Sequence, residues 1–452
     1  MEREELVEWI NSLEKKYQVN EWCINGIHVW PILKVKILFV GFKTTESNNS
    51  NSKTTLLKSS IKGASEYLKL LTSKARVRTE LYCLAPHFRF THEGIYKNRY
   101  YNNLIRACQG HKDFLLFDYG SGSKQYQKNV DYPENTLFLG NIKYFALALR
   151  EIVWRSYKPK SEWRQFDLLL KEVNSVLGAN SLSKTNLIRQ VAYIDLLKKL
   201  YKPLLRRNKV DVVYILCYYV SEMYAMTLAT AELGIVSYDI QHGGQGKEHV
   251  AYANYNVAPQ EGYKLMPRKF WCWDESSAET IQKWTGKQKY HSVEAKGNPW
   301  VEHCIGEFSS DNLSDKKLIL YTMQPLGGIL LDDYIIEAIK KTPFDFEWWL
   351  RLHPRQLEEK SKLISLLKQH NIYNRVEIEK AVELPLPSLL NQCFIHISKF
   401  SGSILEAHML NVKTIILSRT GVESFPEVAK SNLTVTLLNE DSDKLVEHII
   451  CS

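Results

Sequence analysis

Long hydrophobic runs are missing from this sequence of 452 residues. The longest early apolar stretch, residues 28–42, is interrupted by Lys34 and Lys36 and is too short to cross a bilayer. The first five residues, Met1-Glu2-Arg3-Glu4-Glu5, are mostly acidic, whereas a signal peptide opens with basic residues and continues with an apolar segment. We therefore expect a cytoplasmic protein whose only membrane contact would be peripheral, at the inner membrane.

Paired cysteines are also missing, because none of the eight cysteines lies in CxxC or CxxxC spacing. Several of them stand in apolar runs and fit small buried side chains of a protein from a reducing compartment. No HExxH motif occurs, and the acidic pair Asp332-Asp333 opens a predicted helix instead of forming a DxD donor loop. The sequence therefore requires no metal ion and no bound cofactor.

Signatures of nucleotide-dependent motors, Rossmann dehydrogenases and serine hydrolases are lacking as well, since there is no Walker A loop, no GxGxxG after a strand and no GxSxG. The net charge of +9 is spread over short basic clusters, such as residues 198–202 and 206–209. Such clusters fit solvated helical faces, and the alternative is contact with an anionic surface. Because no RNA-binding signature accompanies them, nucleic acid is not an expected partner.

Short apolar strands alternating with helices are what the chain does contain. Residues 210–218 form a buried-strand pattern, residues 221–233 a helix that ends at Gly234, and residues 235–240 a second strand. The second half repeats this order, which predicts doubly wound α/β domains. We expect one domain over residues 1–265, with a mobile loop at 44–55, and another over 266–452 that ends in a terminal helix.

The first candidate site follows the strand at 235–240. Ligands of open parallel sheets bind at the carboxyl ends of strands, where glycines let the backbone approach closely. Asp239 and His242 are candidates for nucleophile, acid or base, and the loop residues Gln241, Lys247 and His249 are candidates for contacts to an anionic donor. Glu222 opens the preceding helix and is a further catalytic candidate. The structural alternative is a tight turn held by hydrogen bonds from Asp239 and His242, with Glu222 as an ordinary first-turn charge.

Two further groups follow strands in the second half, and both suit a phosphate or a carboxylated sugar. Arg351 and His353 point to the same side of a strand that Pro354 ends, or they cap that strand structurally. The other group precedes a helix that carries Glu406, and it consists of Ser398, Lys399, Ser401 and Ser403. These residues can form a phosphate site, a capping box of Ser403 with Glu406, or both at once. Weaker donor-binding candidates are Asn298, Thr322 and Gln324.

The block from Leu233 to Gly243, together with Tyr252, Pro259, Pro267, Trp271 and Trp273, resembles bacterial surface-polysaccharide glycosyltransferases. It is most similar to the retaining β-Kdo transferases of lipopolysaccharide O-antigen and capsule assembly. The Arg351-x-His353-Pro354 and Ser398-x-x-Ser401-x-Ser403 patterns resemble the HP and serine motifs of enzymes that use CMP-sugars, with Gly402 as a departure where a serine is common. The resemblance covers about residues 80–425.

This resemblance implies a GT-B fold, in which two Rossmann-like domains face each other across a cleft. It implies CMP-Kdo as donor, a glycan or lipid-linked acceptor, and a covalent intermediate on Asp239 with retention. Arg351 and His353 would bind the donor's carboxylate or phosphate, and Ser398, Ser401 and Ser403 the CMP phosphate. Two alternatives remain: an inverting transferase that uses a UDP- or GDP-sugar with Asp239 or His242 as base, and a non-catalytic scaffold of glycan assembly.

Overall fold

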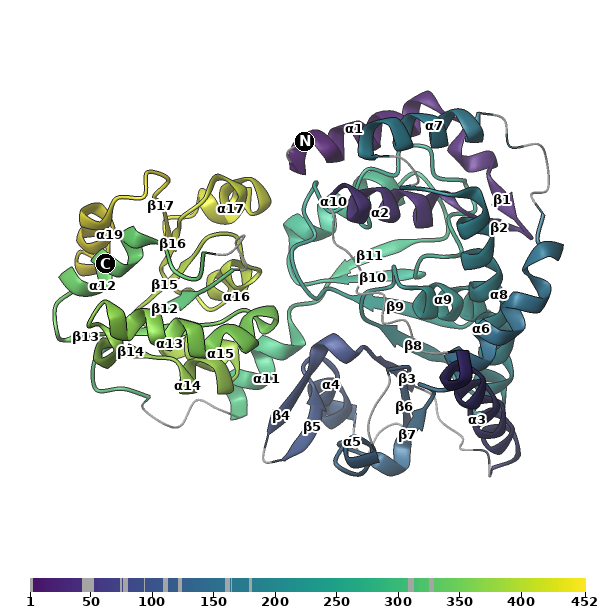
Figure 1. Cartoon of the computed structure of the whole chain (residues 1–452), viewed down its shortest axis with the longest axis horizontal. Coiled ribbons are helices and arrows are strands. Elements are labelled where there is room, and N and C mark those ends of the chain that lie inside the picture. Colours follow the sequence, from purple (N-terminus) through teal and green to yellow (C-terminus); the bar gives the residue numbers. More distant parts are fainter. Residues whose placement is uncertain are drawn as a thin grey trace. The chain divides into compact units, whose positions relative to one another are not determined.

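The computed structural model describes residues 3–42, 53–73, 75, 80–92, 94–108, 113–120, 124–158, 163, 165–178, 181–307, 313–324 and 329–452. The chain forms two compact units, Met1–Asn298 and Pro299–Ser452 (Figure 1). Each unit contains one large sheet whose neighbouring strands are all parallel. The predicted architecture of two doubly wound α/β domains is therefore confirmed.

The first unit contains a seven-stranded sheet in the order β11-β10-β9-β8-β3-β6-β7. Numbered along the chain, this order is 3-2-1-4-5-6-7, a Rossmann order with one added strand. The order reverses between β3 and β8, so ligands are expected outside the carboxyl ends of these strands. The strands are β3 (Glu80–Leu84), β6 (Phe114–Asp118), β7 (Thr136–Phe138), β8 (Val212–Ile215), β9 (Val236–Ile240), β10 (Lys269–Cys272) and β11 (Ser292–Ala295).

Helices and two small hairpins complete the first unit. Pairs that pack against each other include α3 with α6 and α8 with α9. The hairpins are β1 (Cys23–Ile24) with β2 (Ile27–His28) and β4 (Arg89–His92) with β5 (Ile95–Asn98). The helices are α1 (Arg3–Lys16), α2 (Trp30–Gly41), α3 (Lys53–Thr72), α4 (Tyr101–Cys108), α5 (Lys124–Lys128), α6 (Ile142–Val153), α7 (Phe166–Leu177), α8 (Lys184–Arg207), α9 (Ser221–Leu233) and α10 (Glu275–Thr285).

The second unit contains a six-stranded sheet in the order β14-β13-β12-β15-β16-β17, which is the Rossmann order 3-2-1-4-5-6. Its switch point lies between β12 and β15. The strands are β12 (Lys317–Thr322), β13 (Phe346–Arg351), β14 (Val376–Glu377), β15 (Ile395–Ser398), β16 (Thr414–Ile416) and β17 (Thr434–Thr436). The helices are α11 (Pro299–Glu307), α12 (Asp333–Lys341), α13 (Lys360–Gln369), α14 (Glu379–Glu383), α15 (Leu386–Gln392), α16 (Ser403–Met409), α17 (Arg419–Ser424), α18 (Pro426–Ala429) and α19 (Ser442–Ile450).

The domain boundary differs from the one that the sequence predicts. Strands β10 and β11, assigned from sequence to the second domain, pair with β9 in the first sheet, so the first unit extends to Asn298 instead of residue 265. Position along the chain does not determine which sheet a strand joins. The terminal helix is present as α19 and packs on α12 within its own unit. Of the predicted loop, residues 44–52 lie outside the described residues, and residues 53–55 begin α3.

Candidate functional site

Asp239 is a fully buried residue near the end of β9. It lies between Ile215 of β8 and Phe270 of β10 and has no solvent exposure. The backbone N–H of Tyr218 donates to Oδ1 at 3.2 Å, and the Tyr252 hydroxyl donates to Oδ2 at 2.7 Å. Burial raises the Asp239 pKa to about 8, more than these two hydrogen bonds lower it. In this conformation Asp239 is a neutral acid that ties the β9 edge together.

Gln241, also without exposure, acts as a clamp on the turn after β9. Its Oε1 accepts a 2.7 Å hydrogen bond from the Trp273 backbone N–H. Its Nε2 donates to Gly243 O at 2.9 Å and to Ser277 Oγ at 3.2 Å. Because both ends of the amide are engaged within the protein, this geometry fits the structural alternative of a tight turn, with Gln241 as the residue that holds it.

His242 is half-buried at the same edge, close to the switch point between β3 and β8. Its Nε2 lies 3.3 Å from the Tyr219 hydroxyl and its Nδ1 lies 3.4 Å from Ile240 O. The ring also makes an edge contact with Phe88, and the Tyr100 hydroxyl donates to His242 O at 3.4 Å. Burial lowers the His242 pKa to about 4, so the imidazole is neutral and can accept a proton at Nε2.

An aromatic cluster lies beside His242, and only one of its members, Trp273, was named from the sequence, for the family resemblance and not as a site residue. The cluster consists of Phe88, Tyr100, Tyr219 and Trp273, and the Tyr100 and Trp273 ring centroids lie 6.1 Å apart. Trp273 is 5% exposed, and its indole Nε1 has no hydrogen-bond partner among the described residues. Tyr219 and Trp273 closely follow β8 and β10, so the strand-end rule that selected His242 could also have found them.

The other predicted residues of the first unit lie away from this cluster or serve its packing. Glu222 accepts a 3.0 Å hydrogen bond from the Tyr193 hydroxyl. Lys247 is exposed, with its Nζ 3.9 Å from Glu4 of α1. The His249 ring packs on Tyr252 and Tyr219, with centroid distances of 4.7 and 5.6 Å. Asn298, the last residue of this unit, is buried.

At the switch point of the second unit, Thr322 joins two strands and a helix. Thr322 ends β12 and pairs in register with Ser398, which ends β15. Its Oγ1 lies 3.0 Å from His396 Nε2 and 2.9 Å from Ser403 Oγ, and all of these side chains are buried. Burial lowers the His396 pKa to about 3, so the ring stays neutral and its hydrogen bond to the threonine is between uncharged groups.

The loop from Ser398 to Ser403 is held by its own hydroxyls. Ser398 Oγ accepts from the Ser401 N–H at 3.4 Å, and Ser401 Oγ accepts from the Ser403 N–H at 3.2 Å. The predicted capping box is wrong: the N-cap of α16 is Gly402, without a side-chain cap, and Ser403 is the first helical residue. The Ser403 hydroxyl does not cap the helix and instead forms a hydrogen bond with the Thr322 hydroxyl at the end of β12.

Charged groups at this edge are already engaged within the protein. Lys399 Nζ lies 2.8 Å from Asp332 Oδ2, and both side chains are largely buried. Arg351 donates from one guanidinium nitrogen to Ala381 O and to Leu384 O, the latter at 2.7 Å. This favours the structural interpretation for Arg351, whose guanidinium binds carbonyls of α14 and of Leu384, the residue that follows it.

The remaining predictions fall at the same sheet edge. Gln324 and His353 are half-buried just beyond β12 and β13, and Glu406 is buried in α16. The fold thus gathers eight of the nine candidates of the unit Pro299–Ser452 around the ends of β12, β13 and β15, and the ninth, Glu406, lies one turn into the helix that follows. The tenth candidate of the predicted second domain, Asn298, belongs to the first unit. Residues 325–328, which follow Gln324, lie outside the described residues.

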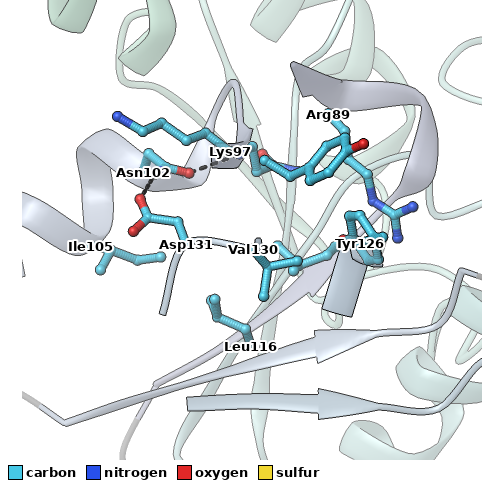
Figure 2. Close-up of a pocket in the computed structure, with 11 residues that line it drawn as sticks. Arg89, Lys97, Asn102, Ile105, Leu116, Tyr126, Val130 and Asp131 are labelled. Carbon is cyan, nitrogen blue, oxygen red and sulfur yellow. Dashed lines mark hydrogen bonds between the residues drawn. The ribbon is translucent and has the colours of Figure 1, made fainter. Parts of the chain in front are cut away.

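A small cavity lies beside the first sheet, at the end of β6 (Figure 2). Arg89 and Tyr126 border one side of it, and Asn102 and Asp131 the other. Arg89 is ion-paired with the buried Asp118 at 2.6 Å, and its guanidinium lies 4.2 Å from the Tyr126 ring centroid. The cavity volume of about 20 Å³ holds one water molecule and no sugar.

Within the part of the chain that the structure describes, no cluster of His, Cys, Asp or Glu side chains is arranged to hold a metal ion. No helix among those residues combines the length and the apolar character that a bilayer crossing needs.

This chain is similar to known proteins in its three-dimensional structure and not in its sequence. No family model and no curated protein matches the sequence. A Listeria monocytogenes protein assigned as a UDP-N-acetylglucosamine 2-epimerase is 12% identical, with 84% of this chain and 89% of that chain covered and a TM-score of 0.49. The Methanocaldococcus jannaschii UDP-GlcNAc 2-epimerase, in complex with UDP-GlcNAc and UDP, is 11% identical, with 82% and 91% covered and a TM-score of 0.46. Anabaena Alr3699/HepE, in complex with UDP, is 11% identical, with 82% and 89% covered and a TM-score of 0.40. The fold assignment rests on the two strand orders described above.

Proposed function

We propose that this protein is a glycosyltransferase of bacterial surface-polysaccharide assembly, with its nucleotide-sugar donor bound by the unit Pro299–Ser452. One observation supports the proposal above the others. The switch point between β12 and β15, where Rossmann-type sheets bind ligands, coincides with Thr322, Ser398, Ser401 and Ser403. The same four residues are among the donor contacts that the sequence predicts.

The charge of this edge favours a donor with a single phosphate. Lys399 is ion-paired with Asp332, and Arg351 binds two backbone carbonyls, so neither cation offers a full countercharge. Ser401 is the partly exposed hydroxyl of this edge, and the buried hydroxyls of Thr322, Ser398 and Ser403 hold the loop that presents it. A CMP-activated acid such as CMP-Kdo divides its two negative charges between one phosphodiester and the carboxylate of the sugar, whereas a UDP- or GDP-sugar places both on one diphosphate. The proposed donor is therefore CMP-Kdo.

The aromatic cluster of the first unit is the proposed acceptor side. Phe88 and Tyr219 are the partly exposed rings of this cluster, and the buried Tyr100 and Trp273 pack behind them. Partly exposed aromatic rings with a hydroxyl at their margin suit a glycan or the sugar of a lipid-linked acceptor.

The donor assignment is tested by calorimetric titration with CMP, UDP and GDP. CMP is expected to bind most tightly, and Thr322→Val and Ser403→Ala should each weaken it about tenfold. Ser365→Ala, which removes an exposed hydroxyl of α13, is the matched control and should leave affinity unchanged. Tighter binding of UDP or GDP would reject CMP-Kdo, and binding of none of the three would favour the scaffold alternative.

An inverting mechanism is the second candidate, and the exposure of two side chains favours it. Nucleophilic attack by Asp239 requires Tyr252 and Tyr218 to release a carboxyl that has no exposure, whereas the His242 ring is partly open. Intact mass measurement after incubation with CMP-Kdo separates the two. Retention predicts a glycosyl adduct that Asp239→Asn abolishes. Inversion, which the sequence pairs with a UDP- or GDP-sugar, predicts no adduct. When the donor and a glycan acceptor are both supplied, it predicts a product of inverted anomeric configuration that His242→Ala abolishes.

A further inference from the structure

Helix α3 (Lys53–Thr72) is attached to the first unit along one face. The Cβ of any residue replacing Gly63 would lie 2.3 Å from Asn141 O, so α3 and the start of α6 are in close contact there. Ser60 donates to Tyr144 O at 2.9 Å, and the Tyr67 hydroxyl donates to Leu200 O at 3.0 Å. This face is fixed, and the opposite face turns away from the protein.

The outward face of α3 exposes large apolar side chains. Leu57, Ile61 and Leu68 are 62%, 65% and 61% exposed. At the angular spacing of an α-helix, these three residues fall within about 40° around the axis and form one stripe. Single exposed leucines are common, but three on one stripe of one helix indicate a surface that another phase or molecule covers.

A stripe of lysines runs beside the apolar stripe. Lys58, Lys62 and Lys69 are exposed and fall within about 40° of one another on the neighbouring arc of the helix. Glu66 is the only acidic residue in α3, and it lies 3.7 Å from Lys62. Among the described residues, Lys58 and Lys69 have no ion-pair partner. The face is therefore both apolar and positively charged.

We propose that this face of α3 docks on the surface of an anionic membrane. Amphipathic helices that lie in the headgroup region insert an apolar stripe and place lysines beside it, where long side chains reach the lipid phosphates. The lysine stripe decides between occupants, because a second copy of this chain would bring the same positive charge, whereas acidic lipid headgroups neutralise it. The inference is independent of the proposed transferase activity.

Vesicle co-sedimentation of the full chain tests this inference. Wild-type protein is expected to pellet with phosphatidylglycerol–phosphatidylcholine vesicles and to stay in solution with phosphatidylcholine alone. Leu57→Ser/Ile61→Ser/Leu68→Ser should lower partitioning at least about tenfold. Exchange of Lys58, Lys62 and Lys69 for glutamine should lower it about fivefold per lysine, and added salt should weaken wild-type binding.

The matched control changes exposed apolar residues elsewhere, Leu168→Ser/Val176→Ser/Phe344→Ser, which are 59%, 43% and 79% exposed in the wild type. It should pellet like the wild type, and thermal melting checks that every variant is folded. Equal pelleting of the α3 variants and the wild type overturns the inference. So does a failure of wild type to bind anionic vesicles, or a dimer in sedimentation velocity that the α3 serine variant dissolves.

Discussion

The Tyr252 hydroxyl donates a 2.7 Å hydrogen bond to Asp239 Oδ2, and neither side chain has any solvent exposure. This bond joins the loop after residue 248 to strand β9. The same loop is held from other sides, since Trp284 Nε1 donates to Tyr252 O at 2.7 Å and the Tyr218 hydroxyl donates to Ala251 O. Asp239 is therefore part of a packed network whose behaviour with pH can be measured.

Asp239 should make stability fall as pH rises. Its pKa is about 8 in the folded protein and near the ordinary 3.8 when unfolded, so between these values the folded state holds the extra proton. The free energy of unfolding then decreases with pH across this window. Asparagine mimics the protonated acid, so the stability of Asp239→Asn relative to wild type should increase by about 2–5 kcal/mol between about pH 5 and about pH 8 in urea unfolding. The exposed Asp345→Asn should show no such change, and parallel pH profiles for Asp239→Asn and wild type would refute the buried neutral acid.

Lys34 should make the free energy of unfolding rise with pH, the opposite of the effect of Asp239. Its buried ammonium donates to Ala253 O at 3.0 Å and Asn254 O at 2.7 Å and lies 4.1 Å from the Tyr255 ring centroid. Burial lowers its pKa from 10.5 to about 8, so between these values the unfolded chain holds the extra proton and stability rises with pH.

Lys34→Met should remove this rise and lower stability by about 2–4 kcal/mol at neutral pH, because two buried carbonyls lose their donor. Urea unfolding measures both effects. The exposed Lys15→Met is the control and should behave like the wild type. A Lys34→Met variant as stable as the wild type would show that the ammonium does not hold this loop.

Gln241→Glu should destabilise the turn after β9. Glutamate can still accept from the Trp273 N–H, but it cannot donate to Gly243 O or Ser277 Oγ as the amide does. We expect a loss of about 2–4 kcal/mol that grows as pH rises and the buried carboxyl ionises. Thermal melting over a pH series measures it, with the exposed Gln282→Glu of α10 as control. Unchanged melting of Gln241→Glu would refute the role of Gln241 in holding the turn.

Arg351→Lys should affect folding and leave nucleotide binding intact. A lysine ammonium cannot span Ala381 O and Leu384 O as the guanidinium does, so stability should drop by about 1–3 kcal/mol. The dissociation constant for CMP should stay within about twofold of wild type, in contrast to Thr322→Val. A large loss of CMP affinity at unchanged melting temperature would restore Arg351 as a donor-binding residue.

Strands and loops that carry local signals were predicted from the sequence, whereas the surroundings of a side chain that depend on distant partners were not. The strand at β9 and the polar loop after it are visible in the sequence because apolar runs and glycines mark them. The burial of Asp239 is not visible, since it depends on Tyr218 and Tyr252. Likewise, the serine loop is recognisable, but its pairing with Thr322 crosses 81 residues from Thr322 to Ser403.

The sequence by itself determined the two α/β domains and the strand ends that carry polar residues, because hydrophobic periodicity and turn residues act over a few neighbours. Only the tertiary structure decided that β10 and β11 complete the first sheet, that Arg351 binds carbonyls and that Lys34 lies beneath the Tyr252 loop. These outcomes follow from packing between segments far apart in the chain, where burial and hydrogen-bond satisfaction select one arrangement among many that the local pattern allows.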